Sequence, residues 1–215
     1  SSNAHYTHRR MCRVLNADFI EIPADSKGNT DWDYLMDHLD KIGTVVVTMG
    51  STGLGDVEPL ADLLPDLQSH GVRIHLDAAY GGFFKIIGSE LESSAHWGKM
   101  ADADSIVIDP HKHGLQPYGC GSIMFRDPAV GKYFKHDSPY TYFTSDDLHL
   151  GEISLECSRA GASAAAFWAT LQLFPLTKEG LGHFLKSTIT AAHLLYGHLQ
   201  RSPGFECYNN PELDI

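Results

Sequence analysis

The sequence predicts an α/β fold in which helices cover both faces of a mainly parallel sheet. Four short runs rich in β-branched residues and bounded by Gly, Pro or Asp indicate strands, at residues 44–49, 72–76, 105–108 and 121–125. In the first part of the chain, helical patterns alternate with these runs. Continuous apolar strands joined by helices are typical of parallel sheets that are buried on both faces.

Residues 58–71 carry the clearest helical pattern, and Gly71 provides a stop signal at its end. One face of this helix carries its leucines, which are Leu60, Leu63, Leu64 and Leu67. Because the segment joins the first two predicted strands, it predicts a strand–helix–strand crossover unit. Farther along, residues 162–174 and 181–200 predict two more helices, and residues 205–215 predict the beginning of a strand.

Composition narrows the class of protein. The chain has 215 residues with 43% apolar and 20% charged content, which is ordinary for a soluble α/β domain with a sizeable core. Its formal net charge of −11 argues against a nucleic-acid or anionic-membrane partner, because neither surface would attract it. No apolar run approaches the roughly 20 residues that span a bilayer. We therefore expect small-molecule chemistry.

The cysteines are spread widely along the chain, at Cys12, Cys120, Cys157 and Cys207. They form no CxxC motif, so the sequence predicts neither a metal site nor a disulfide framework. A reducing, cytoplasmic location fits this pattern best.

Three side chains with chemical potential follow predicted strands. Thr52, Asp77 and Lys112 each come just after an apolar run, and ligands of parallel sheets gather at the carboxyl ends of the strands. A lysine amine can form an imine with an aldehyde, and an aspartate can hold a protonated ring nitrogen. A lysine and an aspartate placed as Lys112 and Asp77 are typical of an enzyme that uses pyridoxal 5'-phosphate.

Five segments carry a family resemblance, in the order SSNAHYTHRRM, TMGSTGLGDVEPL, HLDAAYGGF, ADSIVIDPHKHGLQPYGCGSIMFRD and LECSRAGASAAAFWA. In order and spacing they resemble the pyridoxal-dependent group II amino acid decarboxylases, and within that group the tyrosine/aspartate decarboxylases of archaea and their bacterial relatives. The resemblance covers nearly the whole chain. It implies the fold type I large domain of pyridoxal-dependent enzymes, an amino acid substrate, and a homodimer with shared active sites.

The resemblance also implies a larger subunit than the one printed. Residues 1–200 would form part of the cofactor-binding large domain, without its amino-terminal part, and residues 201–215 would begin a small carboxyl-terminal domain. In the family a phosphate-binding loop precedes the position of His5.

Residue by residue, the resemblance implies that Lys112 binds the cofactor covalently and that Asp77 pairs with its ring nitrogen. The small side chain of Ala79 would leave room for the ring, and His5 would stack on it. Thr52 would lie near the ring substituents, although a turn residue explains it equally well. His8 is the other histidine of this segment that could match the stacking histidine of the family.

The resemblance also implies roles for a second group of residues. His111 would contact the cofactor, and Ser105 could reach its phosphate or simply be a strand residue. Tyr140 and Tyr142 lie where relatives carry a loop tyrosine that donates a proton across the subunit interface, although the match is one of position only and aromatic packing is the stronger interpretation.

Two further residues flank the lysine motif. Asp109 would be structural, because an acidic residue could bind a phosphate only through its backbone or a protonated partner. His113 departs from relatives, which commonly place an aromatic or apolar residue there, and this leaves substrate specificity open.

The leading hypothesis is decarboxylation of an L-amino acid to the corresponding amine and carbon dioxide. One alternative is a pyridoxal-dependent lyase of the sphingosine phosphate lyase type, which breaks a carbon–carbon bond. Another is a shortened, non-catalytic homologue that serves as a dimerisation module. The sequence does not name the substrate.

Overall fold

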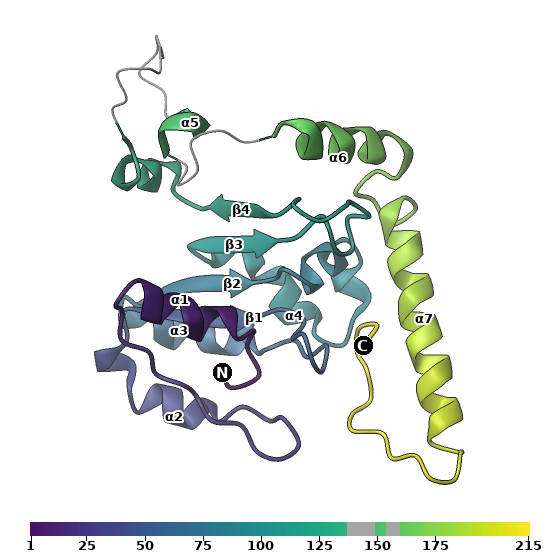
Figure 1. The fold of residues 1–215 in the computed structure, drawn as a ribbon. Coiled ribbons are helices and arrows are strands. Elements are labelled where there is room, and N and C mark those ends of the chain that lie inside the picture. The colour runs from purple at the N-terminus through teal and green to yellow at the C-terminus, as the bar shows by residue number, and fades with distance from the viewer. Residues whose placement is uncertain (137–148, 154–159) are drawn as a thin grey trace.

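The computed structural model describes residues 1–136, 149–153 and 160–215 (Figure 1). In this part of the chain the strands form one four-stranded sheet in the order β1-β2-β3-β4. The strands are β1 (Thr44–Thr48), β2 (Arg73–Asp77), β3 (Ser105–Ile108) and β4 (Ser122–Phe125). The first three are parallel to one another, and β4 runs antiparallel to β3. The predicted strands and the mainly parallel sheet are confirmed.

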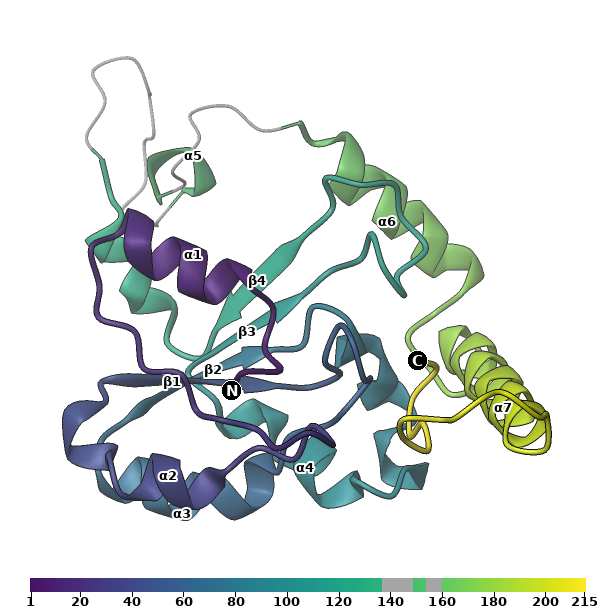
Figure 2. The same ribbon diagram turned by 60° about the horizontal axis from the view of Figure 1, so that its bottom comes forward.

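The described helices lie on both sides of this sheet and along one end of it. They are α1 (Thr7–Val14), α2 (Trp32–Met36), α3 (Leu60–Ser69), α4 (Ser94–Gly98), α5 (Leu150–Ile153), α6 (Ala162–Leu173) and α7 (Leu181–Leu199). Figure 2 shows α1 on one side of the sheet and α2, α3 and α4 on the other. The three helices expected from the sequence are confirmed as α3, α6 and α7. None of the described helices is long and apolar enough to cross a membrane.

The core lies between the sheet and α3. The four leucines that the sequence places on one helix face are all buried, and they pack in one cluster with the apolar residues of β1 and β2. Their burial is the main stabilisation of the crossover unit, since burying one leucine side chain contributes about 2 kcal/mol. In contrast, β4 is exposed along its whole length.

The expected strand within residues 205–215 is wrong, because this segment is irregular in the structure. Side-chain bonds hold it instead: Tyr208 donates to the carbonyl oxygen of Ser26, and Asn209 donates to that of Leu54. Leu213 is fully buried in the core cluster. The carboxyl-terminal residues therefore pack onto the sheet domain, and the domain boundary near residue 200 stays a prediction.

The loops after β1 and β2 touch backbone to backbone at Gly81. A Cβ atom on Gly81 would lie 2.0 Å from the carbonyl oxygen of Met49, which no side-chain rotation can relieve. We predict that Gly81→Ala lowers the free energy of unfolding by about 3 kcal/mol, measured by urea unfolding. Gly98→Ala is the matched control, because a Cβ there meets nothing within 4 Å. Equal stability of the two variants would contradict this contact.

Candidate active site

The carboxyl ends of β1, β2 and β3 border a cavity of about 320 Å³. Thr52, Asp77 and Lys112 all line it, so the predicted convergence of the three strand ends is confirmed. The volume is at the lower end of the roughly 300–1,000 Å³ typical of small-molecule sites. Polar and charged side chains therefore meet at the place where parallel sheets bind ligands.

One row of sheet residues forms the floor of the cavity. The strand register places Thr48, Asp77, Val107 and Ile123 next to one another, one from each strand, and all four line the cavity. Residues opposite each other in paired strands point to the same face. Thr48 Oγ1 is buried, and among the described residues it has no hydrogen-bond partner.

Asp77 ends β2 and is the buried carboxylate of the site. Its Oδ2 is 2.7 Å from Nε2 of His8, and its Oδ1 accepts the backbone N–H of Ala79 at 3.2 Å. Burial alone would raise the pKa of Asp77, but these hydrogen bonds and the charges of His8 and Lys112 lower it. Asp77 is thus an anion held in the floor of the cavity.

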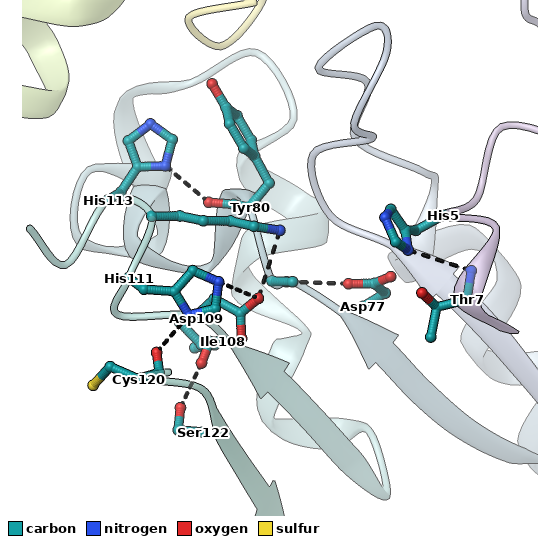
Figure 3. Close-up of polar contacts among 12 residues, drawn as sticks. His5, Thr7, Asp77, Tyr80, Ile108, Asp109, His111, His113, Cys120 and Ser122 are labelled. Atoms are coloured by element: carbon teal, nitrogen blue, oxygen red, sulfur yellow. Dashed lines mark hydrogen bonds and ion pairs between the residues drawn. The ribbon is translucent and has the colours of Figure 1, made fainter. Parts of the chain in front are cut away.

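Lys112 lies one short turn beyond the end of β3. Its Nζ is 3.6 Å from Oδ2 of Asp109, and its side chain is 32% exposed. Asp109 also lines the cavity, and its Oδ2 is 3.5 Å from Nε2 of His111. Figure 3 shows Asp77 between His5 on one side and Asp109 and Tyr80 on the other. Lys112 therefore lines the same cavity as the carboxylates of Asp77 and Asp109.

Local hydrogen bonds hold the loop that carries the lysine. The backbone N–H of Asp109 donates to the carbonyl oxygen of Ala79 at 3.2 Å, which ties the exit of β3 to the exit of β2. His111 contacts the carbonyl oxygen of Cys120 through Nδ1 at 2.9 Å, as Figure 3 shows. The buried amide of Gln116 donates to the carbonyl oxygen of Gly114 within the loop. These contacts fix the loop on the edge of the sheet.

The remaining predicted residues fall into different places. His5 and Ala79 line the cavity, while His111 and Ser105 lie outside the set of residues that line it. The hydroxyl of Ser105 is 2.8 Å from Nδ1 of His75. The roles predicted for these four residues stay predictions.

Tyr140 and Tyr142 lie outside the described residues. The proton-donor role that the resemblance implies for one of them therefore stays a prediction.

Comparison with known proteins decides which family this site belongs to. The chain matches the pyridoxal-dependent decarboxylase conserved domain over residues 1–215. It belongs to the pyridoxal-dependent decarboxylase family. The predicted resemblance is thereby confirmed, and pyridoxal phosphate is the cofactor of this family.

Individual proteins are similar to the chain at low sequence identity. A probable L-tyrosine/L-aspartate decarboxylase of Methanosphaera stadtmanae is 29% identical over 99% of this chain and 54% of that protein. The fold is similar to that of mouse CSAD, with a TM-score of 0.83 and 21% identity, over 98% of this chain and 45% of that one. A sphingosine-1-phosphate lyase of Burkholderia pseudomallei gives a TM-score of 0.74 and 24% identity, over 94% and 46% of the two chains.

The similarity covers only part of each relative. The chain spans about half the length of the curated relatives it matches. The structural neighbours show the predicted fold type I architecture, and their low identity carries nothing beyond the fold.

The residues present in this decarboxylase-family chain fit the family cofactor. An amine that can bind an aldehyde, at Lys112, and an anion that can hold a ring N–H, at Asp77, line one cavity. Thr48 adds a buried hydroxyl that no described residue satisfies. A buried polar group without a partner is costly, so a polar ligand in this cavity would satisfy it.

Sequence reasoning missed two polar residues of this family site. Thr48 could have been found, because it ends the first predicted strand and shares a register row with Asp77. The contact of His8 with Asp77 had no such signal, since the two residues are 69 positions apart and come from a helix and a strand. Asp109, expected to be structural, lies beside the lysine amine.

A second polar cluster joins the loops that follow β2 and β3 to the carboxyl-terminal segment. Tyr80 donates its hydroxyl to Oδ1 of Asp214 at 2.6 Å, and His113 contacts Oδ2 of Asp214 at 3.0 Å through Nε2. Nδ1 of His113 faces the carbonyl oxygen of Tyr80 at 3.0 Å. The two ring nitrogens of His113 thus face two oxygen atoms, one of Asp214 and one of the Tyr80 backbone. This is the structural setting of the departure at His113.

The cluster predicts a pH-dependent contribution to stability. Burial opposes ionisation of Asp214, but hydrogen bonds from His113, Tyr80 and Thr188 outweigh it and lower its pKa from 3.8 to about 2. Because the folded pKa lies below the unfolded one, the stabilisation is complete above pH 4 and is lost as the pH falls toward 2. Its size is about 2 kcal/mol.

We therefore expect Asp214→Asn to destabilise the protein by about 2 kcal/mol at pH 7, with a smaller difference from wild type at pH 3. Urea unfolding at both pH values measures this difference. Asp18→Asn, at an exposed position, is the control and is expected to stay within about 0.5 kcal/mol of wild type. A difference that is the same at both pH values would show that the carboxylate charge is not responsible.

Proposed function

We propose that this chain forms the cofactor-binding part of an enzyme that decarboxylates an L-amino acid to an amine and carbon dioxide. One observation supports this most strongly: Lys112 and Asp77, which follow different strands, line the same cavity. L-tyrosine and L-aspartate are the first substrates to test, because relatives that match 99% of this chain are named as probable decarboxylases of both.

Each residue would have a defined task. When bound, pyridoxal phosphate supplies a protonated ring that accepts the electron pair left by the departing carboxylate. Lys112 would bind the cofactor through its amine and give it up to the amine of the substrate. Asp77 would accept the ring N–H, which favours the protonated ring because Asp77 is an anion. His5 would cover the ring from the side of α1.

Other parts of the proposal rest on the resemblance and on the sequence. A homodimer with shared active sites would bring a tyrosine such as Tyr140 or Tyr142 from the partner subunit to donate a proton. The roles of Thr52, Ala79, His111 and Ser105 as cofactor contacts stay part of the same proposal. A cytoplasmic location rests on the cysteine spacing.

The deciding experiment uses the complete natural protein. The protein is incubated with pyridoxal phosphate, reduced with borohydride and mapped by peptide mass, and carbon dioxide release is measured with L-tyrosine, L-aspartate and the other standard amino acids. An adduct confined to Lys112 together with carbon dioxide release supports the proposal. Aldehyde formation from a phosphorylated amino alcohol, without carbon dioxide, would support the carbon–carbon lyase instead. No adduct at all would favour a non-catalytic role.

A further inference from the structure

His8 makes the shortest described side-chain contact to Asp77. Its Nε2 is 2.7 Å from Oδ2 of Asp77, and the two side chains are 22% and 10% exposed. An N–H that donates to a carboxylate at this distance forms a charge-assisted hydrogen bond, which is stronger than a neutral one. The bond is also largely shielded from bulk water, since both side chains are mostly buried.

The position of His8 is set by α1 and by the strand next to it. α1 lies on the cavity side of the sheet, opposite α2, α3 and α4 (Figure 2), and His8 lies in its first turn. The ring of His75, two residues before Asp77 on β2, meets the ring of His8 edge to face with centroids 6.2 Å apart. Ser105 holds the ring of His75 from β3 at 2.8 Å. The ring of His8 is thus positioned by two neighbouring strands.

His75 is the second histidine ring near Asp77, and its environment disfavours the charged form. Burial lowers the pKa of His75, and the neighbouring His8 lowers it further, while Asp77 opposes this. Because its charged form is disfavoured, His75 places no positive charge against the hydrogen bond between His8 and Asp77.

Asp77 keeps acceptor capacity in this arrangement. A carboxylate offers about four lone-pair positions, and the described contacts use two of them, from His8 and from the N–H of Ala79. One further N–H can therefore be accepted while both existing bonds remain. The contact with His8 fixes the carboxylate without closing it to a ligand.

We propose that His8 is a positioning residue that orients the Asp77 carboxylate and keeps it anionic, so that it can hold the ring N–H of pyridoxal phosphate. This inference rests on the proposed function. It separates the two histidines of the amino-terminal segment: His5 faces the cofactor ring, and His8 acts through Asp77.

The test uses the complete natural protein and three variants. His8→Phe keeps an aromatic ring without a donor, His8→Ala removes the ring from a helix that buries no side chain, and His8→Gln places an N–H near the position of Nε2. His198→Phe, at an exposed position on α7, is the control. The readouts are the dissociation constant for pyridoxal phosphate, the pH titration of the absorbance band of the lysine-bound cofactor, and the unfolding temperature without cofactor.

We expect His8→Phe and His8→Ala to weaken cofactor binding about tenfold, the loss of one hydrogen bond to a charged group, and to shift the absorbance titration. His8→Gln is expected to restore most of both, and His198→Phe to change neither. Binding and titration that match wild type in the Phe and Ala variants would overturn the inference, as would a Gln variant no better than Ala. If wild type itself forms no adduct at Lys112, the proposed function fails, and that result is distinct from either of these.

Discussion

Replacing Lys112 by alanine is expected to abolish the borohydride-trapped cofactor adduct and to lower carbon dioxide release by about 10⁴-fold or more, because removal of a covalent catalytic group has effects of this size. Lys112 is the described lysine that lines the cavity. Its only described ion pair is with Asp109 at 3.6 Å and its side chain is 32% exposed, so folding should change little. Peptide mapping, turnover and unfolding temperature measure the three effects.

The control for this variant is Lys99→Ala. Lys99 also forms an exposed ion pair with an aspartate three residues away, here Asp102 at 3.2 Å, but it lies outside the cavity. It is expected to keep both the adduct and turnover. An adduct that persists at full yield in Lys112→Ala would place the cofactor on another lysine and remove the chemical basis of the proposed function.

Local patterns predicted the fold well because they report burial directly. The leucines of α3 share one helix face, and a helix with such a face packs against an apolar strand in almost any α/β protein. The positions of Asp77 and Lys112 at one sheet edge follow from strand direction alone. The strand expected at 205–215 does not form, because a strand needs a pairing partner and the local sequence does not specify one.

Contacts between distant segments were beyond prediction. Asp214 meets Tyr80 across 134 positions and His113 across 101, and these partners depend on how the carboxyl-terminal segment returns to the sheet. The contact of His8 with Asp77 likewise depends on the placement of α1 over the sheet. The sequence therefore predicts candidate residues at the carboxyl ends of the strands, and the structure adds their contacts with distant segments.

Replacing Asp77 by asparagine tests the electrostatic half of the proposed chemistry. Asparagine has nearly the same shape, and its amide oxygen can still accept a hydrogen bond, but it carries no charge to favour a protonated ring. We expect kcat to fall about 10²- to 10³-fold, the usual loss when a preorganised electrostatic group is removed, while the adduct at Lys112 still forms. Steady-state kinetics and peptide mapping of the same preparation measure both.

The outcome separates charge from packing. Asp66→Asn, on the exposed side of α3, is the control and should leave kcat unchanged. If the Asp77 anion is the essential feature, its loss cannot be offset by the intact hydrogen-bond donors around it, since His8 and the N–H of Ala79 hold the group without replacing its charge. An Asp77→Asn enzyme with kcat within about twofold of wild type would mean that the ring works unprotonated, and Asp77 would then be a structural residue at the end of β2.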